Sequence, residues 1–290
     1  MAKVAFGNKQ ASVLCRLAPA DRLDLIADGL PIILQSAEGF WAAATQLGGT
    51  RESQVLQGFC EEEAAKILIL IDLVRCPPSR VAQTCGQVIR TYYSHLGRLI
   101  YADAQGWKPV NVTELRSYVD KWRRAHGLEG YAGEIIMPNW NRYARESAMY
   151  ADIEIHENGA PIWNQPQVFG RGAFTDEPLV LRLARALDAI GVLTRAGLQA
   201  VSETWAARSF TGIEGYDDNR QLLRSLVDRL HAEGLVRSHA TQDLIRPIWS
   251  YWQLPMYDLD FRELQVPLED LEAEREAERW AAFGHAPDQY

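Results

Sequence analysis

The sequence predicts an all-α protein with one short β-hairpin, and three observations carry this prediction. Apolar residues recur at helical spacing through most of the 290 residues. Residues that start or end helices, chiefly Ser, Thr, Pro and Gly, bound the segments with this pattern. Polar and apolar residues alternate, as they do in a strand, in the segment 151–163.

We expect six helices in the first half of the chain, over residues 20–29, 31–47, 51–75, 79–105, 114–126 and 139–150. Pro31 is tolerated near a helix start, and Pro77 with Pro78 ends the third segment. Ser79 is a suitable cap for the fourth helix, and Gly127 closes the fifth.

The hairpin prediction rests on Asn158-Gly159, because this dipeptide is the strongest short signal for a tight turn between two strands. A Pro- and Gly-rich stretch, 166–178, follows the hairpin and is the expected boundary between modules. We therefore divide the chain into residues 1–170, which end in the hairpin, and a helical C-terminal module, residues 171–290. Within this module the expected helices are 177–191, 195–209, 218–233, 240–253 and 268–282.

Composition narrows the functional classes. The net charge of −8 gives no general attraction for nucleic acid or an anionic membrane, so any RNA contact needs a local basic patch. The chain has no apolar run of membrane-spanning length, and its N-terminus lacks the apolar core of a signal peptide. Cys15, Cys60, Cys76 and Cys85 lack metal-ligand spacing and predict unpaired, buried thiols in a reducing compartment. We expect a soluble cytoplasmic protein without a metal or other cofactor.

The segment RTYYSH places Arg90 five residues before His95. On one continuous helix this spacing is a rotation of about 140°, so the two side chains would converge only across a cleft, for example between two copies. His95 and Arg98 would share one face. A histidine can take the proton of a ribose 2′-hydroxyl while an arginine holds the scissile phosphate. A chance pair on a helix surface is the alternative interpretation.

The preceding helix carries EEEAAK, in which Glu62 and Glu63 stand four and three residues before Lys66. Glu before Lys at these spacings favours an ion pair along a helix. The segment is otherwise largely apolar, and charges in such a setting should be paired or face a cleft. The two interpretations are a single surface ion pair, or a buried ionic cluster that orients the face of His95.

Taken together, these segments resemble the AbiV family of abortive-infection, antiphage proteins, which belongs to the HEPN superfamily. The resemblance spans about residues 25–170. The residues that carry it are Glu62, Glu63 and Lys66, then His95 and Arg98, then Arg145, Tyr150 and Asp152.

The resemblance implies a HEPN-like helical bundle that forms a homodimer, with two Arg–His motifs in one cleft and no metal. Thr91 follows Arg90 here, where HEPN ribonucleases usually have Asn, Asp or His. The implied activity is an endoribonuclease that leaves 2′,3′-cyclic phosphate ends. The candidate catalytic residues are His95, Arg90 and Arg98, and the candidate supporting residues are Glu62, Glu63, Lys66 and Tyr92.

A second candidate site is the basic segment KWRR, with Lys121, Trp122, Arg123 and Arg124. It is the densest basic patch of this acidic chain, and it could bind an RNA backbone while Trp122 stacks on a base. Alternatively, these cations only complement the negative end of a helix dipole.

Two further groups have structural alternatives. Tyr92, Tyr93 and Tyr101 flank the Arg–His motif and could stack bases, although packing is the default for at least two of them. Asp152, Glu154 and His156 share one face of a strand and could bind a metal, but a solvated hairpin face is the preferred interpretation.

Two main functional hypotheses follow. The first is an antiphage effector that cuts RNA and is restrained until infection, by a phage or host protein or by its own acidic C-terminal half. The second is a non-catalytic helical module that senses or binds a phage or host protein or RNA. A third hypothesis, a helical scaffold, would use the polar cluster only to fix a dimer interface.

Overall fold

The computed structural model describes residues 10–128, 136–155, 159–167 and 176–283, and it confirms a mostly helical fold with a small β-hairpin. The helices are the short 3-10 helix η1 (Gln10–Cys15), α1 (Pro19–Leu47), α2 (Arg51–Arg75), α3 (Pro78–Tyr93), α4 (His95–Ala104), α5 (Val112–Trp122), α6 (Trp140–Met149), α7 (Leu179–Ala189), α8 (Arg195–Trp205), α9 (Tyr216–Ala232), α10 (Gln242–Tyr251) and α11 (Leu268–Phe283). The strands are β1 (Arg124–Ala125), β2 (Asp152–Ile155), β3 (Pro161–Asn164) and β4 (Leu264–Gln265).

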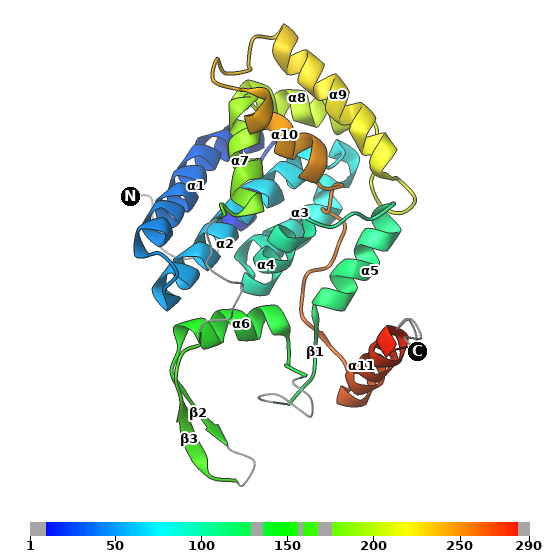
Figure 1. The fold of residues 1–290 in the computed structure, drawn as a ribbon. Helices are drawn as coiled ribbons and strands as arrows, with labels where there is room; N and C mark the ends of the chain where they lie inside the picture. Colours follow the sequence, from blue (N-terminus) through cyan, green and yellow to red (C-terminus); the bar gives the residue numbers. More distant parts are fainter. Residues whose placement is uncertain (1–9, 129–135, 156–158, 168–175, 284–290) are drawn as a thin grey trace, which may run out of the picture.

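The helix α2 lies at the centre of the bundle, with α1 beside it and α3, α4, α7 and α8 packed around it (Figure 1). Every residue from 67 to 75 is buried, so this part of α2 has no solvent-facing side. The buried apolar residues form one cluster that reaches from Leu14 to Phe261. The two expected modules, 1–170 and 171–290, therefore share one core, and their division stays a prediction.

The strands lie at one end of the molecule. Antiparallel β2 and β3 pair Asp152 with Asn164 and project below the bundle, next to α6 (Figure 1). Strands β1 and β4 form a two-residue parallel pair that joins the end of α5 to the segment before α11. No helix of the described residues is long and apolar enough to span a membrane.

The expected helix 79–105 is wrong in one respect, because the chain breaks at Ser94 into α3 and α4. Ser94 has extended backbone angles, and its hydroxyl accepts a hydrogen bond from the Gly97 N–H at 3.0 Å. A serine with this geometry caps the next helix. The two expected helices 20–29 and 31–47 are also one, since α1 continues through Pro31.

The expectation of four unpaired cysteines is wrong for one pair. Cys15 and Cys85 form a disulfide that ties η1 to α3, with their Cα atoms 5.6 Å apart. These residues are 70 positions apart, so sequence spacing gave no indication of the bond. Cys60 and Cys76 are free and buried, as expected.

Two charged residues of α2, Asp72 and Arg75, are buried and bonded to distant parts of the chain. Arg75 donates to Asp72 at 2.8 Å, to the Gln253 carbonyl at 3.0 Å and to the Asn219 side chain at 2.7 Å. Its guanidinium lies against the rings of two neighbouring tryptophans, 4.9 Å from Trp205 and 4.6 Å from Trp252. Because a buried charge is tolerated only when it is paired and hydrogen-bonded, these contacts fix the C-terminal half against α2.

The Asp72 carboxylate accepts two more hydrogen bonds, from the Tyr101 hydroxyl and, at 2.7 Å, from the Met256 N–H. Burial and the neighbouring carboxylate raise the pKa of Tyr101 well above its ordinary value, so the phenol keeps its proton and donates a hydrogen bond to Asp72. The cluster thus joins α2, α4 and the segment after α10.

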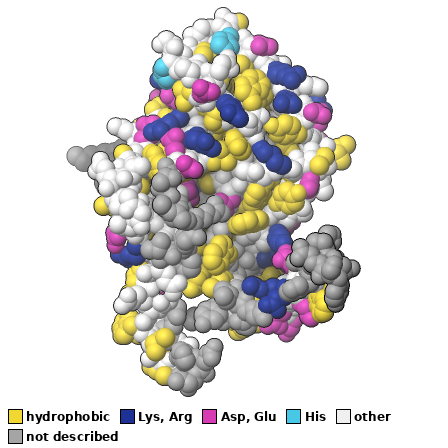
Figure 2. All heavy atoms as spheres, in the orientation of Figure 1, with side chains coloured by type: hydrophobic (Ala, Val, Ile, Leu, Met, Phe, Trp, Pro, Cys, Tyr) yellow, Lys and Arg dark blue, Asp and Glu magenta, His cyan; other side chains and the backbone are white. Residues whose placement is uncertain are grey.

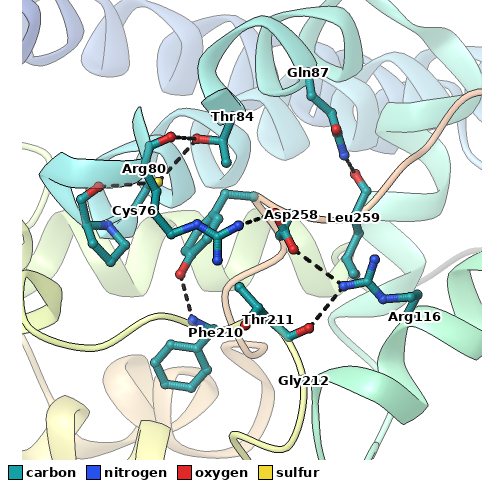
Figure 3. Close-up of polar contacts among 12 residues, drawn as sticks. Cys76, Arg80, Thr84, Gln87, Arg116, Phe210, Thr211, Gly212, Asp258 and Leu259 are labelled. Atoms are coloured by element: carbon teal, nitrogen blue, oxygen red, sulfur yellow. Dashed lines mark hydrogen bonds and ion pairs between the residues drawn. The ribbon is translucent and has the colours of Figure 1, made fainter. Parts of the chain in front are cut away.

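The segment that follows α10 is held at further points (Figure 3). Asp258 accepts from Arg80 of α3 at 2.7 Å and from Arg116 of α5 at 3.5 Å. The Gln87 amide donates to the Leu259 carbonyl, again from α3. This segment is therefore part of the bundle and not a loose linker to α11.

Arg75→Ala should lower the free energy of unfolding by about 3–5 kcal/mol, because it leaves Asp72 buried without its cation. Urea unfolding followed by circular dichroism measures this loss. Arg80→Ala is the control, since the side chains of its ion pair with Asp258 are each 25% exposed, and it should cost about 1 kcal/mol or less. Equal losses in the two variants would contradict the role of the buried pair.

Candidate functional site

The three consecutive glutamates of α2 point in different directions, because successive residues on a helix are about 100° apart. Glu61 accepts from the Gln57 amide at 2.9 Å, and Glu63 pairs with Lys66. Glu62 faces the neighbouring helices and is 3% exposed. The segment EEEAAK therefore supplies both the expected helix-face ion pair and a buried carboxylate.

Glu62 is the centre of an ionic cluster formed by three helices. One oxygen, Oε2, lies 2.6 Å from His95 Nδ1 and 2.6 Å from an Arg98 nitrogen, both from α4. The other oxygen, Oε1, lies 2.6 Å from Arg145 Nε of α6. Arg98 and Arg145 are mostly buried, whereas the His95 side chain is 57% exposed. The cluster thus presents one accessible group, an imidazole.

The proton of His95 is assigned to Nδ1. The Arg98 guanidinium lies 2.7 Å from Nδ1 and could donate to it only if Nδ1 carried no proton. In that case a lone pair of Nδ1 would face the anionic Glu62 oxygen at 2.6 Å, which is repulsive. With the proton on Nδ1, the imidazole donates a hydrogen bond to Glu62, and Nε2 on the opposite side of the ring keeps a free lone pair. This arrangement of carboxylate and imidazole is the one that orients a general base.

Glu62 stays ionised in this setting. Burial alone would raise the pKa of its carboxyl group, but the hydrogen bond from Arg145 and the charges of Arg98 and Arg145 outweigh it, so the pKa is lowered. Two arginines facing one buried carboxylate also explain why Arg98 is not available to a ligand.

The expected partners Glu63, Lys66 and Tyr92 lie together, the first two on α2 and Tyr92 on α3. Lys66 pairs with Glu63 and lies 5.5 Å from the centre of the Tyr92 ring. Tyr93 accepts a hydrogen bond from the Ala11 N–H, and Tyr101 is buried against Asp72. Packing is therefore confirmed as the role of Tyr93 and Tyr101.

The structure separates Arg90 from His95 by the break at Ser94, so the rotation of 140° expected for one helix does not apply. Arg90 is exposed in the last turn of α3, and within the described residues it forms no hydrogen bond or ion pair. Thr91 is buried and donates to the Gln87 carbonyl at 3.2 Å. Thr91 thus gives the histidine no polar support.

The basic segment at the end of α5 is largely neutralised by the C-terminal part of the chain. Lys121 pairs with Glu278 at 2.6 Å and Arg124 with Glu274 at 2.5 Å, both on α11. Arg123 pairs with Asp120 at 2.8 Å. Figure 2 shows basic and acidic side chains next to one another beside α11. These cations are therefore not a free patch in this conformation.

A cavity of about 370 Å³ borders the Glu62 cluster, between α2, α4, α6 and the end of α5. Glu62 and Arg145 belong to its wall, and so does Trp122. Leu99 and Asp103 line it from α4, where they follow His95 by one and two turns. Sequence analysis did not anticipate this cavity, because its lining residues come from four separate segments.

Sequence reasoning missed the contact between Glu62 and Arg145, which lies 83 residues away. The resemblance had pointed to Arg145 without a role, and Tyr150, from the same stretch, is exposed. Within the described residues, no group of three His, Cys, Asp or Glu side chains could hold a metal ion. The alternative of a metal at Asp152, Glu154 and His156 lies partly outside these residues.

Glu62→Gln should lower the free energy of unfolding by about 3–5 kcal/mol at neutral pH, because Arg98 and Arg145 lose their counter-charge. A carboxylate with a lowered pKa stabilises the fold above its ordinary pKa, and this stabilisation is lost as the pH falls through the folded value. The difference in the free energy of unfolding between wild type and Glu62→Gln should therefore become smaller below a pH of about 4. Urea unfolding at a series of pH values measures it.

Glu52→Gln serves as the control on the same helix, because Glu52 is exposed. Its ion pair with Arg51 lies at the surface, so the loss of stability should be far smaller than for Glu62→Gln. A gap for Glu62→Gln that stayed constant into acid would contradict an ionised Glu62.

Comparisons with known proteins add no relative to this picture. The expectation of an AbiV-like protein rests on the residues of this chain alone. No family model matches the chain, and comparisons with curated proteins and with solved structures also found no match.

Proposed function

We propose that this protein is a metal-independent endoribonuclease of the HEPN type that acts in antiphage defence. The observation that carries the proposal is the exposed His95 imidazole, whose Nδ1 is held by the buried Glu62 carboxylate at 2.6 Å. A histidine held in this way has a fixed tautomer and presents its other nitrogen to a substrate. The role in defence rests on the resemblance to the AbiV family.

In the proposed reaction, His95 Nε2 takes the proton of a ribose 2′-hydroxyl. The 2′-oxygen forms a bond to phosphorus, and the bond between phosphorus and the 5′-oxygen breaks. The imidazolium then gives its proton to the leaving 5′-oxygen. The products are a 2′,3′-cyclic phosphate and a free 5′-hydroxyl, and Glu62 stabilises the imidazolium between the two proton transfers.

The two arginines have different roles in this proposal. Arg98 is buried against Glu62, so it is a positioning residue that holds the carboxylate where it can accept a hydrogen bond from the imidazole. Arg90 is exposed and free of ion pairs among the described residues, which suits it to bind the phosphate. In a homodimer, the Arg90 of one copy could serve the His95 of the other.

A second function, binding of RNA or a protein without cleavage, is favoured by one observation. Thr91, the residue after Arg90, is buried, and its hydroxyl donates a hydrogen bond to the Gln87 carbonyl within α3. It therefore adds no polar group to the site. A binding module would need the surface around His95 but not its proton transfer.

The first test is RNA cleavage in EDTA by wild type, His95→Ala and His231→Ala, with mapping of the RNA ends. His95→Ala should reduce cleavage at least about 100-fold, because it removes the general base. His231 is the matched control, since it is an exposed histidine of α9, and its variant should cut as wild type does. Equal cleavage by wild type and His95→Ala would refute the catalytic proposal, and RNA that is bound but not cut would favour the binding module.

We also propose that α11 restrains the basic segment. The ion pairs of Lys121 and Arg124 with α11 lie at the surface, where each contributes about 0.2–1 kcal/mol, so α11 is able to leave. A deletion of residues 258–290 would remove α11 but also Leu259 and Phe261, which belong to the core, so it would not test the restraint alone. Removal of residues 267–290 leaves the core and β4 in place.

The double variant Glu274→Gln, Glu278→Gln should bind single-stranded RNA about 2- to 10-fold more tightly at low salt, because Lys121 and Arg124 become available. The difference should shrink as salt rises. Glu272→Gln with Glu276→Gln is the control on the same helix, since neither carboxylate pairs with Lys121 or Arg124. Fluorescence anisotropy measures the affinities. An equal gain from both double variants would indicate a general charge effect and no specific restraint.

A further inference from the structure

The cavity beside the Glu62 cluster has room for a small ligand. Its volume of about 370 Å³ falls in the range of pockets that enclose small molecules. Most of its wall comes from α2 and α6, and Gly58 lies in the α2 part of it. A Cβ atom added at Gly58 would meet no atom of another described element within 4 Å, so this stretch of the wall faces open space.

Two tryptophans give the wall accessible aromatic surface. Trp122, at the end of α5, is 36% exposed, and Trp140, at the start of α6, is 50% exposed. The ring centre of Trp107 lies 5.6 Å from that of Trp122, and the ring centre of Tyr143 lies 6.3 Å from that of Trp140. Neighbouring rings therefore support both indoles. The face of an indole attracts a cation more strongly than the face of a phenyl or phenol ring.

Two carboxylates of the same wall are accessible. Glu61 of α2 is half-buried and Asp103 of α4 is exposed, and both line the cavity. Glu61 accepts a hydrogen bond from the Gln57 amide at 2.9 Å, and Asp103 accepts one from the Asn141 amide at 3.4 Å. An ionised carboxylate has about four lone-pair sites and keeps its charge when an amide donates to it. Both side chains therefore still attract a cation.

Negative charge prevails in the described part of this wall. The charged side chains that line the cavity are three carboxylates, those of Glu61, Glu62 and Asp103, and one guanidinium, that of Arg145. Arg145 is bonded to Glu62, and Arg98 pairs with the same carboxylate. Even when Arg98 is counted, three carboxylates face two guanidinium groups. The cavity should therefore favour a cation over an anion such as a phosphate.

We propose that this cavity binds a small organic ammonium ion, with its alkyl groups against Trp122 and Trp140 and its charge near Glu61 and Asp103. The rings alone would accept a neutral ligand of the same shape, and the carboxylates alone would accept a hydrated inorganic cation. The two together select a cation that carries an apolar surface. Binding of this ligand needs no proton transfer by His95, so the site goes beyond the proposed nuclease.

The test titrates the full chain with choline and with 3,3-dimethylbutan-1-ol, in which a carbon atom replaces the quaternary nitrogen of choline. The two molecules have nearly the same shape and differ in charge. In ligand-observed NMR titrations choline should bind at least about 5-fold more tightly, because only choline is attracted to the indole faces and the carboxylates as a cation. Phosphocholine should bind more weakly than choline, because the carboxylates of the wall repel its phosphate.

Gly58→Leu tests whether choline occupies the cavity. The added side chain should fill the space at this position and weaken choline binding at least about 10-fold. The helix should tolerate the change, because leucine is a better helix former than glycine. Gly29→Leu is the matched control, since Gly29 is a residue of α1 outside the cavity where an added Cβ likewise meets no other described element within 4 Å.

Two further variants test the chemistry of the wall. Trp140→Leu and Asp103→Asn should each weaken choline binding at least about 3-fold, because one removes an indole face and the other a charge. Trp163→Leu and Asp28→Asn are the controls, since both residues are exposed and lie outside the cavity, and these variants should bind choline as wild type does.

The failure of this site can be told apart from the failure of the nuclease. His95→Ala should bind choline as wild type does, whether or not it cuts RNA. Choline binding by a protein that cuts no RNA would support the ammonium site and contradict the nuclease. Absence of choline binding, equal affinity for choline and its neutral analogue, tighter binding of phosphocholine, or wild-type affinity in Gly58→Leu would each overturn the site.

Discussion

Burial of α2, which is complete over residues 67–75 and also covers Glu62, is the constraint on which the structure depends. A charged side chain buried in such a helix must be paired and hydrogen-bonded, because water cannot reach it, and here many of the partners lie on other elements. Glu62 finds them on α4 and α6, while Asp72 and Arg75 find them on α9 and in the segment after α10. The charged residues of this one helix therefore tie α4, α6, α9 and the segment after α10 to the centre of the bundle. The candidate site around Glu62 is one of the clusters in which a buried charge of α2 is paired.

The helical fold could be predicted because its signals are local. Apolar periodicity, proline stops and Asn158-Gly159 gave the helices and the hairpin within a few residues. The break at Ser94 was not predicted, because the apolar pattern continues through it and gives no sign that the serine caps a new helix. The bond between Cys15 and Cys85, and the two-residue pair of β1 with β4, depend on contacts between distant segments that no local pattern contains.

The candidate site was predictable in its residue types but not in their roles. The apolar setting of EEEAAK pointed to a buried ionic cluster near His95, and Glu62 does bind His95 and Arg98. Sequence could not say which of three adjacent glutamates turns inward, because that choice depends on the rotation of α2 against its neighbours. Nor could it show that α11 would pair with Lys121 and Arg124, since exposed ion pairs leave no periodic pattern.

The long reach of the Asp72 and Arg75 contacts has a consequence for synthesis. Met256 is 184 residues after Asp72, and Gln253 is 178 residues after Arg75. A ribosome adds about 5–20 residues per second, so α2 waits about 10–40 s before these partners exist. During that interval Asp72 and Arg75 lack the hydrogen bonds that Met256 and Gln253 later provide, and the nascent chain cannot close its core. The bundle is therefore completed late, after nearly all of the protein has emerged.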